Sequence, residues 1–184
     1  KQYENEIFSN CKLQKKIKVV LDSGNGAAGP YAKKVFEKIG AEVISLNTEP
    51  DGNFPNHHPD PSKEKNLKDL IESVSVNQAD LGFAFDGDGD RVGMVDNNSN
   101  VVSPDHIIML LSEYFLQKKK GPVIYDVKCS NQVSKIIEDN GGDPIIEKTG
   151  HFHIKNKIRE TNAILGAEMS GHIFINYDWY GFDD

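Results

Sequence analysis

The chain has few of the features that mark secreted, membrane or nucleic-acid-binding proteins. Its 184 residues include only two cysteines, Cys11 and Cys129. Two are too few for a disulfide framework and fit a reducing compartment. No apolar run is long enough to cross a bilayer. No basic run is long enough to follow a phosphate backbone, and the formal net charge is −7. We therefore expect a cytoplasmic protein that binds neither membrane nor nucleic acid.

What is present is the composition of a globular protein, with 38% apolar and 27% charged residues. Short apolar runs alternate with segments of helical periodicity, and this layout occurs twice. In the first unit we expect strands at 17–21, 42–46, 81–85, 92–95 and 101–102, with helices at 30–39 and from Ser62 onward. In the second we expect strands at 122–127, 143–147, 163–167 and 173–175, with helices at 104–119, 131–140 and 152–161. The pattern predicts an α/β fold of two consecutive similar domains, 1–103 and 104–184, each a mixed sheet packed with helices.

An alternating acidic stretch follows the apolar run 81–85 and reads Asp86-Gly87-Asp88-Gly89-Asp90-Arg91. Three like charges this close would raise one another's pKa values unless a cation lay among them. Carboxylate oxygens suit a hard divalent ion, and Mg²⁺ is the ion we expect on Asp86, Asp88 and Asp90. Arg91 adds a fixed positive charge that can hold a phosphate in two-point contact.

The acidic stretch has two other interpretations. A Gly-rich acidic segment can be a plain solvated turn, although that accounts better for one or two aspartates than for three. An EF-hand loop also opens with alternating aspartates. Counted from Asp86, however, Arg91 stands where that loop needs Gly, and Asn97 stands where it needs Glu. A metal site is the favoured interpretation.

Two motifs in the first unit have both a functional and a structural interpretation. Gly24, Gly26 and Gly29 form G-x-G-x-x-G between a strand and a helix, which is the dinucleotide-binding pattern. The same glycines would serve a tight turn with close packing, and this is favoured. Neighbouring His57 and His58 could bind a metal. They have no acidic or Cys partner at ligand spacing, so a structural role is favoured for them too.

The Asp-Gly-Asp-Gly-Asp-Arg stretch resembles the metal loop of the α-D-phosphohexomutases, the family of phosphomannomutase and phosphoglucomutase. Four other stretches resemble the same family and extend the match from Ile17 to Asp184. They are the turn Asn25-Gly26-Ala27-Ala28-Gly29, the loop Pro50-Asp51-Gly52-Asn53-Phe54-Pro55, Thr149-Gly150-His151, and Glu168-Met169-Ser170-Gly171-His172. The aromatic segment from Trp179 to Asp184 matches the part of the family that follows. In the family the Pro-rich loop supports the fold beside the metal.

The resemblance implies roles for further residues of the second unit. Lys128 follows a strand and, without the family, would pass for a surface lysine; the family makes it a phosphate contact or proton-transfer group. His151 would line the same centre. Glu168 and Ser170 would bond neighbouring sugar hydroxyls, since together they accept and donate, and His172 would lie near the substrate. With Arg91, Lys128 and His151 are the expected catalytic residues.

The implied activity is the reversible conversion of a hexose 1-phosphate, of mannose or glucose, to its 6-phosphate through a phosphoserine and a bisphosphate intermediate. The family's phosphoserine lies in a Ser-His-Asn-Pro loop, and no serine of this chain is followed by histidine. The family's fourth domain would follow Asp184. We therefore expect domains 1 and 4 of a four-domain parent and the last part of domain 3 to be missing, and the chain alone to be inactive. Alternatives are a phosphoglucosamine mutase, disfavoured by Met169, and a non-catalytic module that binds metal and sugar phosphate.

Overall fold

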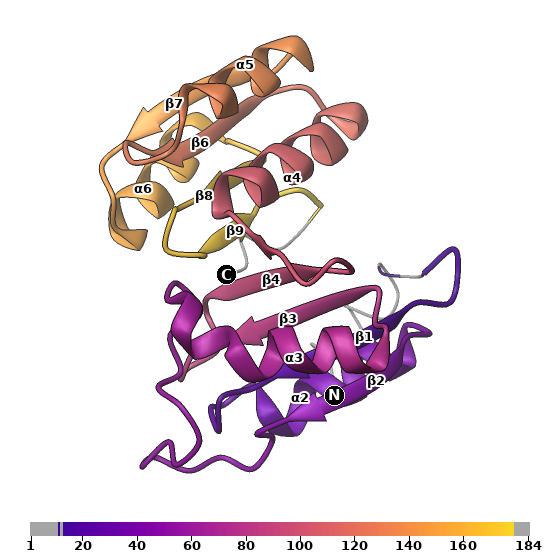
Figure 1. Cartoon of the computed structure of the whole chain (residues 1–184). Coiled ribbons are helices and arrows are strands. Elements are labelled where there is room, and N and C mark those ends of the chain that lie inside the picture. The colour runs from indigo at the N-terminus through magenta and orange to yellow at the C-terminus, as the bar shows by residue number, and fades with distance from the viewer. Residues whose placement is uncertain (1–10, 12, 179–184) are drawn as a thin grey trace. The chain divides into compact units, whose positions relative to one another are not determined.

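The computed structural model describes residue 11 and residues 13–178. The chain divides into two compact units, residues 1–102 and residues 103–184 (Figure 1). The expected aromatic segment from Trp179 to Asp184 lies outside the described residues. None of the helices in the described part of the chain is both long and apolar enough to cross a membrane.

The first unit is built on a mixed sheet in the order β2-β1-β3-β4-β5. Its strands are β1 (Lys18–Asp22), β2 (Glu42–Leu46), β3 (Leu81–Phe85), β4 (Val92–Asp96) and β5 (Val101–Val102). β1 pairs in parallel with β2 and β3, while β4 is antiparallel to β3 and to β5. Asp22, at the end of β1, is in register with Leu46 and Ala84. The loops that follow the three parallel strands therefore leave the sheet at one edge.

Helices α2 (Gly29–Lys38) and α3 (Lys68–Asn77) cover this sheet. Alternate residues of β1 point to opposite faces: Val20 packs in the cluster that includes Leu70 and Val74 of α3, and Val19 and Leu21 pack with Ala32 of α2. The strand is apolar on both faces because each face carries a helix, which is why it appears in the sequence as a continuous apolar run.

The expectation of a helix from Ser62 onward is wrong. A short 3₁₀ turn, η1 (Glu64–Leu67), precedes α3, which begins at Lys68. The hydroxyl and the backbone N–H of Ser62 both donate to Asp60 Oδ1, at 2.7 and 3.1 Å. This local turn uses the groups that a helix cap would need, so the chain is not yet helical there.

The second unit repeats the plan with a mixed sheet in the order β7-β6-β8-β9. Its elements are α4 (Pro104–Lys118), β6 (Pro122–Asp126), α5 (Asn131–Asp139), β7 (Asp143–Glu147), α6 (His151–Thr161), β8 (Leu165–Ala167) and β9 (Ile173–Ile175). β6 runs parallel to β7 and β8, and β9 is antiparallel to β8. Two mixed sheets with helices on their faces confirm the predicted fold class.

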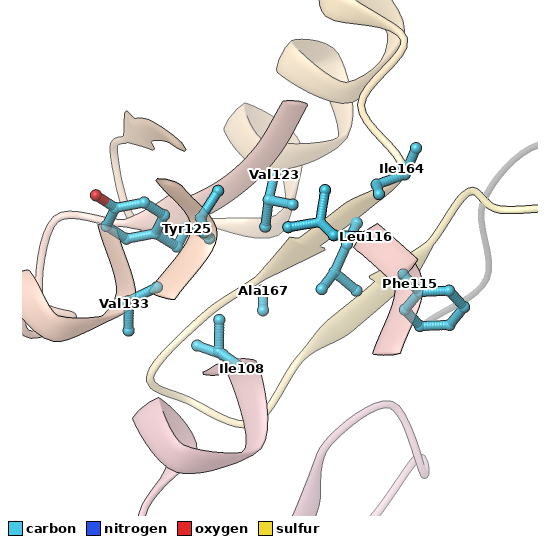
Figure 2. Packing of buried hydrophobic residues seen from close by; sticks show 10 residues of the cluster. Ile108, Phe115, Leu116, Val123, Tyr125, Val133, Ile164 and Ala167 are labelled. Carbon is cyan, nitrogen blue, oxygen red and sulfur yellow. The ribbon is translucent and has the colours of Figure 1, made fainter. Parts of the chain in front are cut away.

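The core of the second unit lies on both sides of β6. Val123 and Tyr125 belong to a cluster that includes Leu116 of α4 and Val133 of α5 (Figure 2). Between them in sequence, Ile124 belongs to the opposite cluster, with residues of α6. The helices hold the carboxyl ends of β6, β7 and β8 in place, and these ends carry the candidate site residues of this unit.

Candidate functional site

The acidic stretch forms the tight connection between β3 and β4. The Asp86 N–H donates to the Arg91 carbonyl oxygen at 3.3 Å and closes the loop. Gly89 has φ of +86°, a left-handed conformation that side chains other than glycine rarely adopt. One carboxylate oxygen each of Asp86, Asp88 and Asp90 lies within 4.8 Å of the other two. The loop thus gathers three carboxylates around one point.

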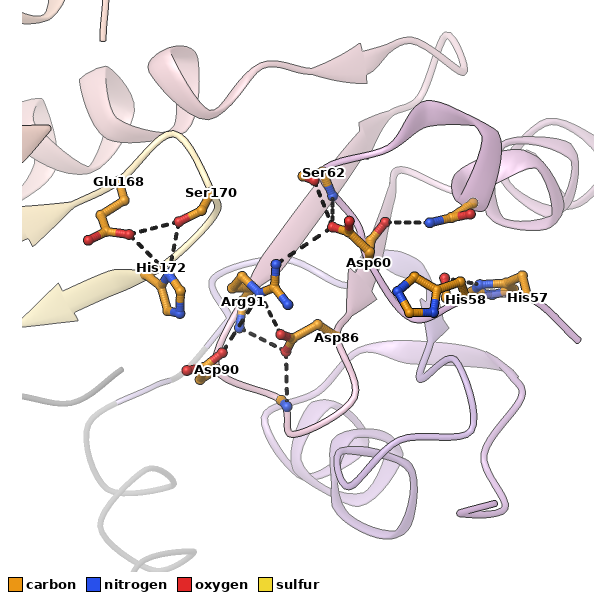
Figure 3. A network of polar contacts seen from close by, with 12 residues as sticks. His57, His58, Asp60, Ser62, Asp86, Asp90, Arg91, Glu168, Ser170 and His172 are labelled. Carbon is orange, nitrogen blue, oxygen red and sulfur yellow. Dashed lines mark hydrogen bonds and ion pairs between the residues drawn. The ribbon is translucent and has the colours of Figure 1, made fainter. Parts of the chain in front are cut away.

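Asp86 is the fixed member of this group, being 1% exposed. Its Oδ1 accepts the backbone N–H groups of Gly89 and Arg91 at 3.0 and 3.1 Å, and its Oδ2 accepts Arg91 Nε at 2.5 Å (Figure 3). Burial alone would raise the pKa of Asp86, but these donors and the guanidinium charge lower it below its usual value. Asp86 is therefore an ionised, oriented carboxylate near neutral pH.

The residues present fit a hard divalent cation. All three candidate ligands offer carboxylate oxygens, the donors that such ions prefer. Asp88 is exposed and Asp90 is half-buried, so both can turn toward an ion, while Asp86 supplies the rigid side. Asp86 Oδ2 accepts only the Arg91 Nε–H among the contacts described, which leaves a lone pair on that oxygen.

Arg91 also connects the acidic loop to the Pro-rich loop. Its Nη1 lies 3.7 Å from Asp60 Oδ1, and its Nε lies 3.9 Å from Asp90 Oδ1. Sequence reasoning named Arg91 but missed Asp60. The signal was available, because Asp60 lies in the Pro-rich segment 50–61, whose first six residues form the loop that was expected to support the fold beside the metal. The guanidinium is thus held by carboxylates on two sides and keeps a 30% exposed side chain.

The glycine motif packs against the acidic loop. A Cβ on Gly26 would lie 2.8 Å from the carbonyl oxygens of both Asp86 and Gly87. The N–H of Ala27 donates to the Gly87 carbonyl at 2.9 Å. No side chain fits between the two backbones, so this glycine is explained by close packing. The structure favours the packing interpretation of the G-x-G-x-x-G pattern over the dinucleotide one.

His57 makes structural contacts on both ring nitrogens. Nε2 lies 2.9 Å from Asp22 Oδ2, and Nδ1 lies 3.1 Å from the carbonyl oxygen of His58. Both partners are acceptors, so only the doubly protonated ring can donate to both. Burial acts to lower the pKa of His57, but the His58 carbonyl and the Asp22 carboxylate outweigh it and raise the pKa above its usual value. His58 is exposed.

This contact predicts a pH-dependent stability. A raised folded-state pKa means that the stabilisation is complete below the ordinary value of about 6.5 and is lost as pH rises through the folded-state pKa. We expect His57→Gln to lower the free energy of unfolding by about 1–2 kcal/mol at pH 6 and by less at pH 8. Urea unfolding of the chain and of the variant at both pH values checks this; an equal loss at both would contradict it.

In the second unit, Lys128 and His151 lie in the segments that follow β6 and β7, two parallel strands whose carboxyl ends lie side by side. Lys128 is exposed in the turn after β6, and His151 is the exposed first residue of α6. The ring centroids of His151 and His172 lie 6.3 Å apart. The structure thus brings His151 close to the loop between β8 and β9, which carries the remaining candidates.

Glu168, Ser170 and His172 form a closed polar triangle (Figure 3). Glu168 Oε2 accepts the Ser170 hydroxyl at 2.9 Å and lies 3.2 Å from His172 Nδ1, which is itself 2.8 Å from Ser170 Oγ. Glu168 Oε1 accepts the Gly150 N–H at 2.8 Å. Burial would raise the pKa of Glu168, which is 3% exposed, but these partners lower it. The carboxylate is therefore charged and oriented before any ligand binds.

Residues 1–99 match the family model described as phosphoglucomutase/phosphomannomutase, alpha/beta/alpha domain II. Residues 103–184 match that of alpha/beta/alpha domain III. The chain belongs to the phosphoglucomutase/phosphomannomutase family. The predicted family is therefore confirmed.

Individual relatives agree with this family assignment. It is 52% identical to the phosphomannomutase/phosphoglucomutase of Pseudomonas putida and 45% identical to a phosphoglucomutase of Neisseria meningitidis. A crystal structure of a family protein from Burkholderia thailandensis has a TM-score of 0.96 at 47% identity. Each comparison covers all of this chain and 40% of the relative. The chain thus spans about two fifths of the proteins it resembles.

Proposed function

We propose that the full-length protein containing this chain interconverts hexose 1-phosphate and hexose 6-phosphate, with mannose or glucose as the sugar. The observation that carries the proposal is the acidic loop. Asp86, Asp88 and Asp90 converge there, and Arg91 is locked to the buried Asp86. Phosphoryl transfer needs positive charge placed where negative charge develops, and a cation with a fixed guanidinium meets that need. Relatives named for this activity support it.

The three aspartates are proposed to hold Mg²⁺, which fits an all-oxygen donor set that includes a rigid carboxylate. When bound, the ion supplies charge neutralisation at the transferring phosphoryl group. Arg91 orients Asp86 through two hydrogen bonds and offers its partly exposed guanidinium to phosphate. The phosphoryl donor is proposed to be a phosphoserine outside this chain, in keeping with the 40% coverage of the relatives.

The second unit is proposed to bind the sugar. Glu168 accepts from one hydroxyl, Ser170 contacts its neighbour, and His172 holds both side chains in place. Lys128 contacts phosphate or moves a proton at the reacting hydroxyl, and His151 lines the same edge. The bisphosphate intermediate must be held in two orientations, which requires a sugar site that accepts equivalent hydroxyl pairs. Domains 1 and 4 of the parent complete the proposed cytoplasmic enzyme, and the 184-residue chain alone is expected to have no turnover.

The test is a mutase assay on the full-length protein with Mg²⁺, a trace of hexose 1,6-bisphosphate, and mannose 1-phosphate or glucose 1-phosphate. Formation of the 6-phosphate, and its loss when EDTA removes the metal, is the expected result. Glucosamine 1-phosphate serves as the comparison sugar. Turnover of glucosamine 1-phosphate alone would overturn the proposed sugar class, and no turnover of any of the three would overturn the activity.

A further inference from the structure

The buried carboxylate of Asp126 joins two of the loops at the active edge of the second unit. Asp126 is the last residue of β6 and is 0% exposed. Its Oδ1 accepts the N–H of Lys128 at 2.8 Å and also lies 3.7 Å from Cys129 Sγ. Its Oδ2 accepts the N–H of Met169 at 3.1 Å. One oxygen therefore holds the lysine turn, and the other holds the loop that carries Glu168 and Ser170.

The hydrogen bonds of Asp126 lie just beyond the point where the pairing of β6 and β8 ends. The last register pair of β6 and β8 is Tyr125 with Ala167. One residue further along, the two chains diverge into their loops, and backbone pairing no longer fixes their separation. The Asp126 side chain spans this gap, with one carboxyl oxygen accepting from each loop.

Two further hydrogen bonds join the loop after β7 to the loops after β6 and β8. Glu168 Oε1 accepts from Gly150, in the loop before His151, and Val127 N–H donates to the Glu147 carbonyl at 3.0 Å. The loops after β6, β7 and β8 thus form one connected set. Asp126 is the side chain that connects the lysine turn to the sugar loop.

The first unit contains a counterpart, which argues against accidental burial. Asp22 ends β1, is 0% exposed, and accepts the N–H of Gly24 through Oδ1 at 2.9 Å, two residues on, as Asp126 does with Lys128. Its Oδ2 holds His57 of a distant loop. In both units a buried aspartate at the end of the first strand clamps its own turn and a remote loop.

We propose that Asp126 is a positioning residue that sets the sugar loop relative to the Lys128 turn, so that the loop presents Glu168 and Ser170 in the geometry that binds the substrate. This inference rests on the proposed function of that loop. Loss of the clamp should weaken sugar binding and leave the binding of Mg²⁺ unchanged, because the acidic loop belongs to the other unit.

The experiment compares three variants of the full-length protein. Asp126→Asn keeps the shape but offers one acceptor oxygen and one NH₂ group to two N–H donors, so one loop loses its partner. Glu168→Gln tests the proposed sugar contact directly. Asp143→Asn is the matched control, since Asp143 is exposed at the start of β7. The readouts are KM and kcat for hexose 1-phosphate, Mg²⁺ affinity, and amide hydrogen exchange of segments 127–130 and 167–172.

For Asp126→Asn we expect a rise in KM of about tenfold with a smaller change in kcat, faster exchange in at least one of the two segments, and unchanged Mg²⁺ affinity. Exchange as slow as in the wild type would overturn the inference. Faster exchange in Asp126→Asn with an unchanged KM would also overturn the inference, provided that Glu168→Gln raises KM. The proposed function would stand in that case. An unchanged KM in Glu168→Gln would overturn the proposed sugar role itself, and the inference with it.

If Asp126→Asn does not fold, Asp126→Glu decides the question with the same readouts. Glutamate keeps two acceptor oxygens but moves them by one methylene. The inference then requires a raised KM together with altered exchange in segment 167–172. A folded Asp126→Glu protein with wild-type KM and wild-type exchange would overturn it.

Discussion

The Asp88→Asn variant of the full-length protein should lose most of its mutase activity, by at least about a hundredfold in kcat. Asp88 is an exposed member of the three-carboxylate group, and among the described residues its side chain has no hydrogen bond on which the loop depends. Asparagine keeps its size but removes one negative charge from the proposed Mg²⁺ site. The measurements are kcat at saturating substrate and Mg²⁺ affinity by calorimetry.

The control for this prediction is Asp69→Asn, the same change at an exposed position on α3. Both variants should unfold at the wild-type temperature, and only Asp88→Asn should lose activity and metal affinity. Wild-type turnover in Asp88→Asn would refute the metal assignment. A similar loss in both would show that the effect is not specific to the acidic loop.

Arg91→Gln should reduce both stability and activity, whereas Asp88→Asn should reduce activity alone. Arg91 supplies the guanidinium partner of Asp86, whose carboxylate is almost fully buried. Removing one member of a buried pair leaves a charge without its partner, which typically costs 3–5 kcal/mol; Arg91 is 30% exposed, so we expect about 2–3 kcal/mol. Activity should also fall by at least about a hundredfold, because the fixed charge next to the phosphoryl group is gone.

The pH dependence of this loss has a defined sign. The pKa of Asp86 is lowered in the folded state, so its contribution is present above the ordinary value of 3.8 and is lost as pH falls through the folded-state pKa. The stability difference between wild type and Arg91→Gln should therefore shrink in strong acid. Denaturant unfolding at pH 7 and pH 3 measures it. Lys135→Gln, which removes an exposed positive charge from the other unit, is the control and should cost little at either pH. A difference that grows in acid would contradict the assigned role of Arg91.

The loop after β3 and the loop after β8 have the same hydrogen-bonding pattern. In each unit the N–H of the first loop residue donates to the carbonyl of the last: Asp86 to Arg91, and Glu168 to His172. In each, the acidic side chain contacts the basic residue that closes the loop. One loop presents carboxylates to a proposed cation, and the other presents a carboxylate and a hydroxyl to a proposed sugar.

The sequence by itself determined the fold class and most of the elements. Apolar runs such as 81–85 and 122–126 predict buried strands because both faces of these strands are covered by helices. The acidic loop was also visible in the sequence, since its three carboxylates lie within five residues and need no distant partner to converge. These features depend on neighbours in the chain, and their signals are local.

Only the tertiary structure decided which residues support that chemistry. Ser62 resembles a helix cap but is bound by Asp60, and His57 resembles a ligand but is bound by Asp22. Gly26 resembles a nucleotide turn but packs on the acidic loop. In the sequence Asp126 is one residue of the expected strand 122–127, whereas in the structure its side chain bonds a residue 43 positions away. Each of these roles is set by a partner distant in sequence or by a hydrogen bond that competes with the local preference, and no local pattern contains that information.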